Sequence, residues 1–127
     1  MTGLLDTSVV IAMERGRPLA TELLPDEALL SAVTIGELET GVHTAADDAE
    51  RERRLGSLST VRSEWVILPV DTEVAAVFGR LRAGLRGTGR RVRLHDLWIA
   101  ATARAHGLPL YTQDADFEAM GIDVVRV

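Results

Sequence analysis

The sequence has 127 residues, of which 46% are hydrophobic, and a formal net charge of −5 at pH 7. This length and composition predict one globular domain over residues 1–127 and argue against disorder. All 14 basic residues are arginine and no cysteine is present, which excludes P-loop and Schiff-base chemistry, disulfides and thiolate metal sites.

Short apolar strands alternate with helices along the chain. Strands are predicted at 3–5, 28–32, 65–70, 110–111 and 123–127, and helices at 8–14, 34–45, 47–61, from 72 onward and at 95–106. This alternation predicts an α/β fold, with a parallel sheet of four to five strands covered by helices on both faces. No apolar run approaches the roughly 20 residues that a membrane span needs, so we expect a cytoplasmic protein without membrane contact.

One carboxylate lies inside the apolar stretch LLDTSVVIAM, residues 4 to 13. Burying a lone carboxylate is costly unless it is paired, protonated or given a cation. We predict that Asp6 ends the first strand and emerges at the carboxyl edge of the sheet. Thr7 and Ser8 are expected to turn the chain and cap the following helix.

Further acids are predicted at the same edge of the sheet, where ligand sites of parallel sheets form. Glu37 is expected in the first turn of the helix after the second strand, and Asp96 at the start of the helix before the fourth. Asp114 and Asp116 follow the fourth strand. Neighbouring carboxylates repel one another, and Mg²⁺ or Mn²⁺ removes that repulsion. Such a pocket supports hydrolysis of a phosphodiester with one or two metal ions.

Each acid also has a structural interpretation. Thr34 and Glu37 match a capping box, in which Glu37 only bonds the backbone of the cap. Asp96 fits a helix N-cap or a first-turn acid that the helix dipole favours. Asp114 and Asp116 fit ordinary turn residues. The joint pattern of acids, rather than any single one, therefore indicates a metal site.

An arginine-rich stretch covers residues 80–93 and carries six of the 14 arginines. One interpretation is a solvated helix face followed by a polar loop. Another is a rim that contacts phosphate groups beside the acids, since the guanidinium fork suits phosphate. An acidic protein partner fits equally well. The candidate contact residues are Arg86, Arg90, Arg91 and Arg93.

Four segments resemble the PIN-domain ribonucleases, specifically the VapC-type toxins of type II toxin–antitoxin pairs: LLDTSVVI, SAVTIGELETGV, LHDLWIAATARAHGLPLYT and QDADFE. The resemblance covers nearly the whole chain and implies a single PIN domain with a PIN-like three-layer α/β/α fold. It implies an endoribonuclease toxin that depends on Mg²⁺ or Mn²⁺ and cleaves RNA, with tRNA and rRNA as candidate substrates. It further implies a homodimer and neutralisation by a cognate VapB-type antitoxin.

The motif match also assigns residues. It implies that the catalytic and metal-binding acids are Asp6, Glu37, Asp96 and Asp114, with Thr7, Ser8 and Thr112 in support. The run Thr112–Phe117 is one residue shorter between its polar positions than the usual family motif, so Asp116 is a second candidate for the fourth acid.

Two alternatives belong to other functional classes. One is a PIN-fold binding module without catalysis, in which some of the four acids would be missing. The other is a phosphoacceptor signalling domain, which is disfavoured because such domains use a lysine that this chain lacks.

Overall fold

A computed structural model describes residues 1–127, and its centre is a single sheet of five strands. All four strand pairings are parallel, which confirms the predicted sheet. The spatial order is β3-β2-β1-β4-β5, with the strands β1 (Thr2–Leu5), β2 (Glu27–Ser31), β3 (Val66–Leu68), β4 (Leu110–Thr112) and β5 (Val124–Arg126).

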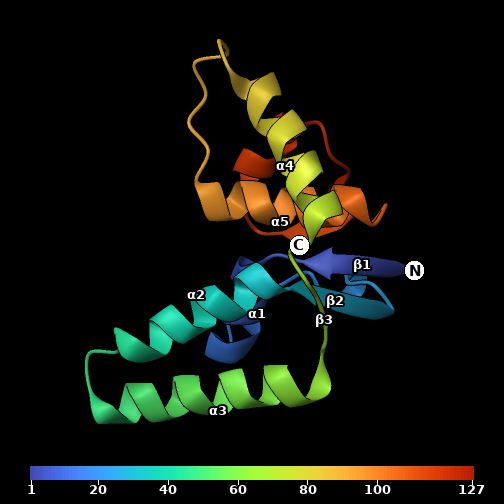
Figure 1. The fold of residues 1–127 in the computed structure, drawn as a ribbon. Helices are drawn as coiled ribbons and strands as arrows, with labels where there is room; N and C mark the ends of the chain where they lie inside the picture. The colour runs from blue at the N-terminus through green and yellow to red at the C-terminus, as the bar shows by residue number, and fades with distance from the viewer.

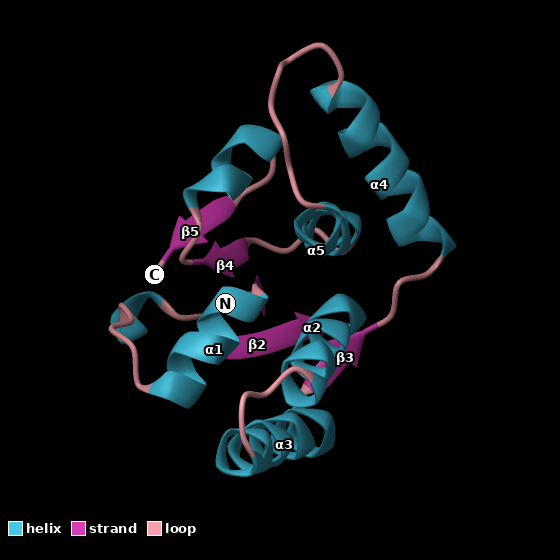
Figure 2. Ribbon diagram, turned by 90° about the vertical axis from the view of Figure 1, so that its left-hand side faces the viewer, coloured by secondary structure: helices cyan, strands magenta, loops and turns pink.

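Helices cover both faces of this sheet. Figures 1 and 2 show α1, α2 and α3 on one face and α4 and α5 on the other, so the predicted three-layer architecture is confirmed. The helices are α1 (Thr7–Arg15), α2 (Ala32–His43), α3 (Asp48–Glu64), α4 (Thr72–Leu85) and α5 (Leu94–Ala105); the short 3₁₀ helices η1 (Thr21–Leu23) and η2 (Ala115–Met120) were not predicted. None of these helices is both long and apolar enough to cross a membrane.

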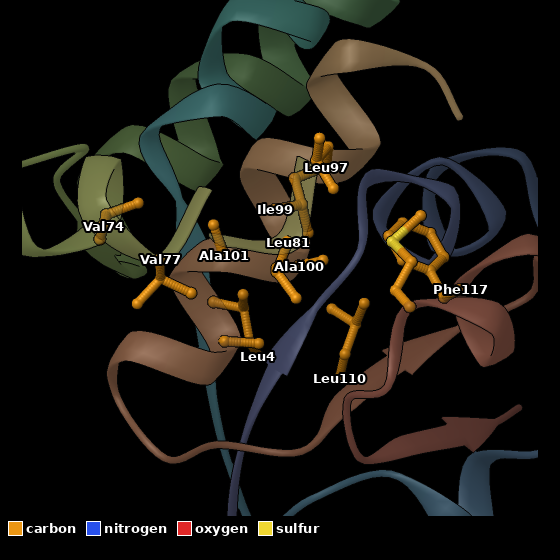
Figure 3. Packing of buried hydrophobic residues seen from close by; sticks show 12 residues of the cluster. Leu4, Val74, Val77, Leu81, Leu97, Ile99, Ala100, Ala101, Leu110 and Phe117 are labelled. Atoms are coloured by element: carbon orange, nitrogen blue, oxygen red, sulfur yellow. The ribbon is translucent and has the colours of Figure 1, made fainter. Parts of the chain in front are cut away.

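The strands supply both hydrophobic cores because successive side chains point to opposite faces of a sheet. Leu4 and Leu110 belong to a cluster of 12 buried residues packed against α4 and α5, and Figure 3 shows them beneath those helices. Leu5, Leu30 and Tyr111 point the other way and pack against α1, α2 and α3. Both faces of the central strands are therefore buried, which fixes the strand ends in place.

The chain order creates a switch point beside β1. The chain lays down β1, β2 and β3 in one direction, then returns to place β4 and β5 on the other side of β1. The crevice at the carboxyl ends of the strands where the order reverses is the usual ligand site of such sheets. Here that crevice lies between β1 and β4, where the Asp6 amide donates to the Tyr111 carbonyl over 2.8 Å.

Two helix starts differ from the sequence predictions. The N-cap of α2 is Ser31, whose hydroxyl accepts from the Val33 amide at 3.1 Å. Thr34 is fully buried inside the helix, so the capping-box interpretation is wrong and Glu37 lies in the second helical turn rather than the first. The cap moved because the strand runs directly into α2, with no intervening loop.

The starts of α1 and α5 also differ. Asp6 is the N-cap residue of α1, and the helix begins at Thr7, so the prediction that Thr7 and Ser8 cap it is wrong. Arg93 is the N-cap residue of α5, so the N-cap interpretation of Asp96 is wrong and its first-turn interpretation is right.

Candidate active site

The carboxylate of Asp6 lies at the switch point and is 4% exposed. Its Oδ2 atom accepts hydrogen bonds from Ser8 Oγ at 2.7 Å and from Thr112 Oγ1 at 2.9 Å. Ser8 belongs to the first turn of α1, whereas Thr112 ends β4. These two hydroxyls satisfy a carboxylate that would otherwise be buried without partners, and they fix its orientation.

Glu37 is tied to the same region by Thr7. The hydroxyl of Thr7 donates to Glu37 Oε1 at 2.8 Å and lies 2.9 Å from the hydroxyl of the buried Thr34. Thr7 is itself buried. The contact joins α1 to α2 across 30 positions of sequence, and no local pattern signals it.

Asp96 and Asp114 share one arginine. Arg93 Nε donates to Asp96 Oδ2 at 3.2 Å, and its Nη2 lies 3.8 Å from Asp114 Oδ2. The side chain of Asp96 is 8% exposed, whereas that of Arg93 is 69% exposed. Arg93 therefore reaches from the surface onto two of the predicted acids, a contact that the sequence analysis did not assign to it.

The charges of these residues act on one another. Burial raises the pKa of Asp96, and Arg93 opposes that rise, whereas the charges of Asp6 and Glu37 add to it. The pKa of Arg93 is raised chiefly by Asp96, with smaller contributions from Asp114 and Glu37. We call the set of Asp6, Glu37, Asp96 and Asp114 the acidic edge, because the charges of Asp6 and Glu37 act on Asp96, and Asp114 shares Arg93 with it.

Asp116 lies apart from the acidic edge. Its side chain is exposed on η2, and its backbone amide donates to Asp114 Oδ1 at 2.9 Å. Asp114 is the N-cap residue of η2, and its own amide donates to Thr112 Oγ1 at 3.0 Å. Of the two candidates for the fourth acid, Asp114 is the one in contact with Arg93.

The acidic edge fits a divalent cation in its chemistry. Its donors are all carboxylate oxygens, with hydroxyls behind them, as Mg²⁺ and Mn²⁺ prefer. In this conformation no three of the carboxylates are arranged to hold one ion, and Arg93 supplies the positive charge instead. The repulsion that raises the pKa of Asp96 is the cost that a bound cation would remove.

The remaining arginines of the 80–93 stretch lie elsewhere. A cavity of about 680 Å³ at the connection between α4 and α5 is lined by Arg82, Arg86, Arg90 and Arg91. None of these four is in an ion pair, unlike Arg93. The structure thus separates Arg93 from the three arginines with which the sequence grouped it.

Comparison with known proteins places the chain among described sequences and folds. The PIN domain model matches residues 3–123. Ribonuclease VapC5 of Mycobacterium tuberculosis (strain ATCC 25618 / H37Rv) is 46% identical over 129 residues, which is 98% of this chain and 95% of that protein. Ribonuclease VapC8 of the same strain is 47% identical over 103 residues, or 80% of this chain and 89% of that protein.

A solved structure matches the fold equally well. The crystal structure of VapBC-5, a member of the VapBC family of toxin-antitoxin systems from Mycobacterium tuberculosis, superposes with a TM-score of 0.89 at 43% identity. The match covers 99% of this chain and 98% of that one. The likeness therefore extends over the sheet and both helical layers.

Proposed function

We infer the function of this chain from its family: it belongs to the PIN-domain proteins and, among them, to the VapC-type ribonucleases. It is the toxin of a type II toxin–antitoxin pair, an endoribonuclease that hydrolyses RNA phosphodiester bonds and is neutralised by a cognate VapB-type antitoxin. The chemistry is assigned to the acidic edge.

The observation that carries this assignment is Asp6. A carboxylate that is 4% exposed, at the switch point of a parallel sheet, and held by two hydroxyl donors has a fixed position before any ligand arrives. Fixed, partly desolvated charges bind cations and developing charges more strongly than solvated ones. The charge of Asp6 also acts on that of Asp96, so at least two of the predicted acids lie close enough to interact.

We propose that Asp6, Glu37, Asp96 and Asp114 hold Mg²⁺ or Mn²⁺, with Asp114 rather than Asp116 as the fourth acid. When bound, such a cation activates water as the nucleophile and stabilises the negative charge that develops on the phosphate. Thr112 and Ser8 orient Asp6, and Thr7 orients Glu37. These hydroxyls keep the carboxylates pointed at the crevice when the cation is exchanged.

Arg93 competes with the cation for Asp96 and Asp114. Its own side chain is largely exposed, but that of Asp96 is only 8% exposed, so the departure of Arg93 leaves a buried carboxylate that needs another positive charge. Arg93 can therefore leave the acids when a cation takes its place. Once released, its guanidinium is free to bind a phosphate group of the RNA at the mouth of the crevice.

The proposed partners follow from the relatives. The VapBC-5 structure is that of a toxin-antitoxin system, which supports a cognate antitoxin for this chain. We propose RNA as the substrate, with tRNA and rRNA as the candidates. We also propose a homodimer, for which the exposed Val66 of the edge strand β3 is available to a second copy; light scattering measures the mass of the purified protein in solution.

The substitution Asp6→Asn tests the proposed function. We expect purified Asp6→Asn to lose Mg²⁺- or Mn²⁺-dependent cleavage of RNA and to lose toxicity when expressed without an antitoxin. The matched control is Asp123→Asn, because Asp123 is exposed, directly precedes β5 and lies at the opposite edge of the sheet. Cleavage by Asp6→Asn at the rate of the control would contradict the assignment, and absence of cleavage by the unmodified chain would favour a binding module.

A further inference from the structure

A second polar site stands beside the acidic edge, at the connection between α4 and α5. Figure 2 shows this connection arching from the end of α4 to the start of α5. Its cavity of about 680 Å³ has arginines along its walls, and the apolar side chains of Leu85, Val92 and Leu97 line it as well. No acidic residue lines it. We call it the arginine cavity.

The positive charge of the arginine cavity is uncompensated. Arg82, Arg86, Arg90 and Arg91 are all exposed, and none lies within ion-pair distance of a carboxylate. The chain as a whole carries a net charge of −5. The four unpaired guanidinium groups give the surface around this cavity a positive charge, opposite in sign to that of the whole chain. Such a concentration of charge attracts anions.

The loop that carries these arginines has a defined conformation. The Thr88 hydroxyl donates to the Leu85 carbonyl at 2.7 Å and accepts from the Arg90 amide at 3.3 Å. Gly87 and Gly89, on either side of Thr88, both have left-handed backbones, with φ of +78° and +71°. The turn therefore sets where Arg86 and Arg90 leave the backbone, while their long side chains stay free to adjust.

The arginine cavity and the acidic edge are linked through the residues on either side of Arg93. Val92 and Leu94 line the cavity and flank Arg93 in sequence, and Arg93 contacts Asp96 and Asp114. Leu94 and Leu97 come from the same first turn of α5 that presents Asp96. Groups bound in the cavity therefore lie near the start of α5, where Asp96 is presented.

We propose that the arginine cavity binds the phosphate backbone of the substrate RNA next to the bond that is cut; this deepens the proposed function and rests on it. Guanidinium groups bind phosphates by paired hydrogen bonds, and the apolar wall accepts the face of a base or ribose. We favour RNA over an acidic protein because RNA has to approach the acidic edge, and the acidic edge repels a polyanion. A neighbouring positive site is needed to bring RNA there, whereas a protein partner has no such need.

The test compares two double variants that lose the same charge. Arg86→Gln with Arg90→Gln removes two arginines of the cavity, and Arg53→Gln with Arg62→Gln removes two exposed, unpaired arginines of α3. Binding of a fluorescently labelled single-stranded oligoribonucleotide is followed by anisotropy in EDTA, so that nothing is cleaved. Circular dichroism and thermal melting establish that both variants are folded.

We expect the cavity pair to weaken RNA binding on the order of tenfold relative to the control pair. The slope of log K against log salt should fall in magnitude by about 1.4, because each phosphate contact on a single strand contributes about 0.7. Equal affinities and slopes for the two pairs would overturn the proposal. So would loss of binding to a labelled poly-glutamate peptide with unchanged binding to RNA, which would assign the cavity to an acidic protein.

The outcome is separable from that of the proposed function. Binding is measured without metal and without turnover, so it does not depend on the acidic edge being catalytic. A chain that binds RNA through the cavity and yet fails to cleave it with Mg²⁺ or Mn²⁺ would overturn the nuclease assignment and support the cavity. If the unmodified chain cleaves RNA and the two double variants bind RNA with equal affinity, the nuclease assignment is supported and the proposal for the cavity is overturned.

Discussion

The acidic edge and the arginine cavity adjoin one another, but the protein builds them in opposite ways. Asp6 and Asp96 are 4% and 5% exposed. Two hydroxyl groups donate to Asp6, and the guanidinium of Arg93 donates to Asp96. The cavity arginines are exposed and unpaired, on a loop between two helices. The difference teaches that the fold fixes the groups assigned to chemistry in advance, whereas it leaves the groups assigned to backbone binding free to follow a flexible ligand.

The largest effect should come from Asp96→Asn, which tests whether the acidic edge trades stability for function. We expect cleavage to fall on the order of 10³-fold, since metal-assisted stabilisation contributes several kcal/mol. Stability should rise, by an amount in the range of about 0.5–2 kcal/mol typical of stabilising substitutions. Rates of RNA cleavage and denaturant unfolding at neutral pH measure the two changes.

The sign of the stability change follows from the pKa. The pKa of Asp96 is raised, first by burial and further by Asp6 and Glu37. A carboxyl that binds its proton more tightly in the folded state costs stability as pH rises through its pKa. The uncharged amide removes that cost at neutral pH. A less stable Asp96→Asn protein would show that the Arg93 contact outweighs burial and repulsion.

A smaller effect is expected when only the support of the acidic edge is removed. Thr112→Val deletes the hydroxyl that bonds both Asp6 and the Asp114 amide, and we expect a loss of about 10–100-fold in metal affinity or activity. Thr102→Val is the matched control, because Thr102 is equally buried but bonds the Trp98 carbonyl in α5. Both should lose about 1–3 kcal/mol of stability, and only Thr112→Val should lose cleavage.

Arg93→Gln probes the boundary between the two regions. Removing the guanidinium that contacts Asp96 and Asp114 should tighten Mn²⁺ binding by roughly three- to tenfold, equivalent to about 1 kcal/mol. Calorimetric titration with Mn²⁺ measures it without RNA. Arg91→Gln removes the same charge without a carboxylate contact and should change Mn²⁺ affinity far less; equal shifts would mean that Arg93 acts only through general charge.

The effects expected for the loop of the arginine cavity are on stability alone. A side chain at Gly87 meets no atom within 4 Å, but its φ of +78° disfavours any other residue, so Gly87→Ala should cost about 1–2 kcal/mol. Gly84→Ala, inside α4 with equally open surroundings, should gain about 0.5–1 kcal/mol. Thermal unfolding compares them, and a stabilising Gly87→Ala would mean that the loop takes another conformation.

The sequence predicted which acids form the acidic edge better than it predicted the side-chain contacts that hold them. The alternation of strands and helices was sufficient to place Asp6, Asp96 and Asp114 at one edge, because parallel strands end on the same side and the helix that leads into the next strand starts there. The bond between Thr7 and Glu37, and the contact of Arg93 with Asp114, join residues that no periodic pattern links. Side-chain contacts of this kind depend on how helices pack, which a single sequence does not state.

Local signals also gave way to tertiary structure at the helix starts. The segment containing Thr34 and Glu37 satisfies the pattern of a capping box, yet Ser31 caps α2. Thr34 is fully buried and pairs with Thr7. A short motif indicates which cap a segment can form in isolation. Here the packing of Thr34 against α1 places that residue inside the helix, so it does not form the cap.

The bond from Thr112 to Asp6 spans 106 positions of the sequence, and this separation bears on when the protein becomes dangerous to the cell that makes it. Chains emerge from the ribosome from the N-terminus onward, and parallel pairings between distant segments form late. Asp6 is synthesised before its partner strand β4, whose Thr112 lies 106 positions later in the sequence. A growing chain therefore cannot complete the surroundings of Asp6 before β4 has left the ribosome, and toxicity cannot begin before that point.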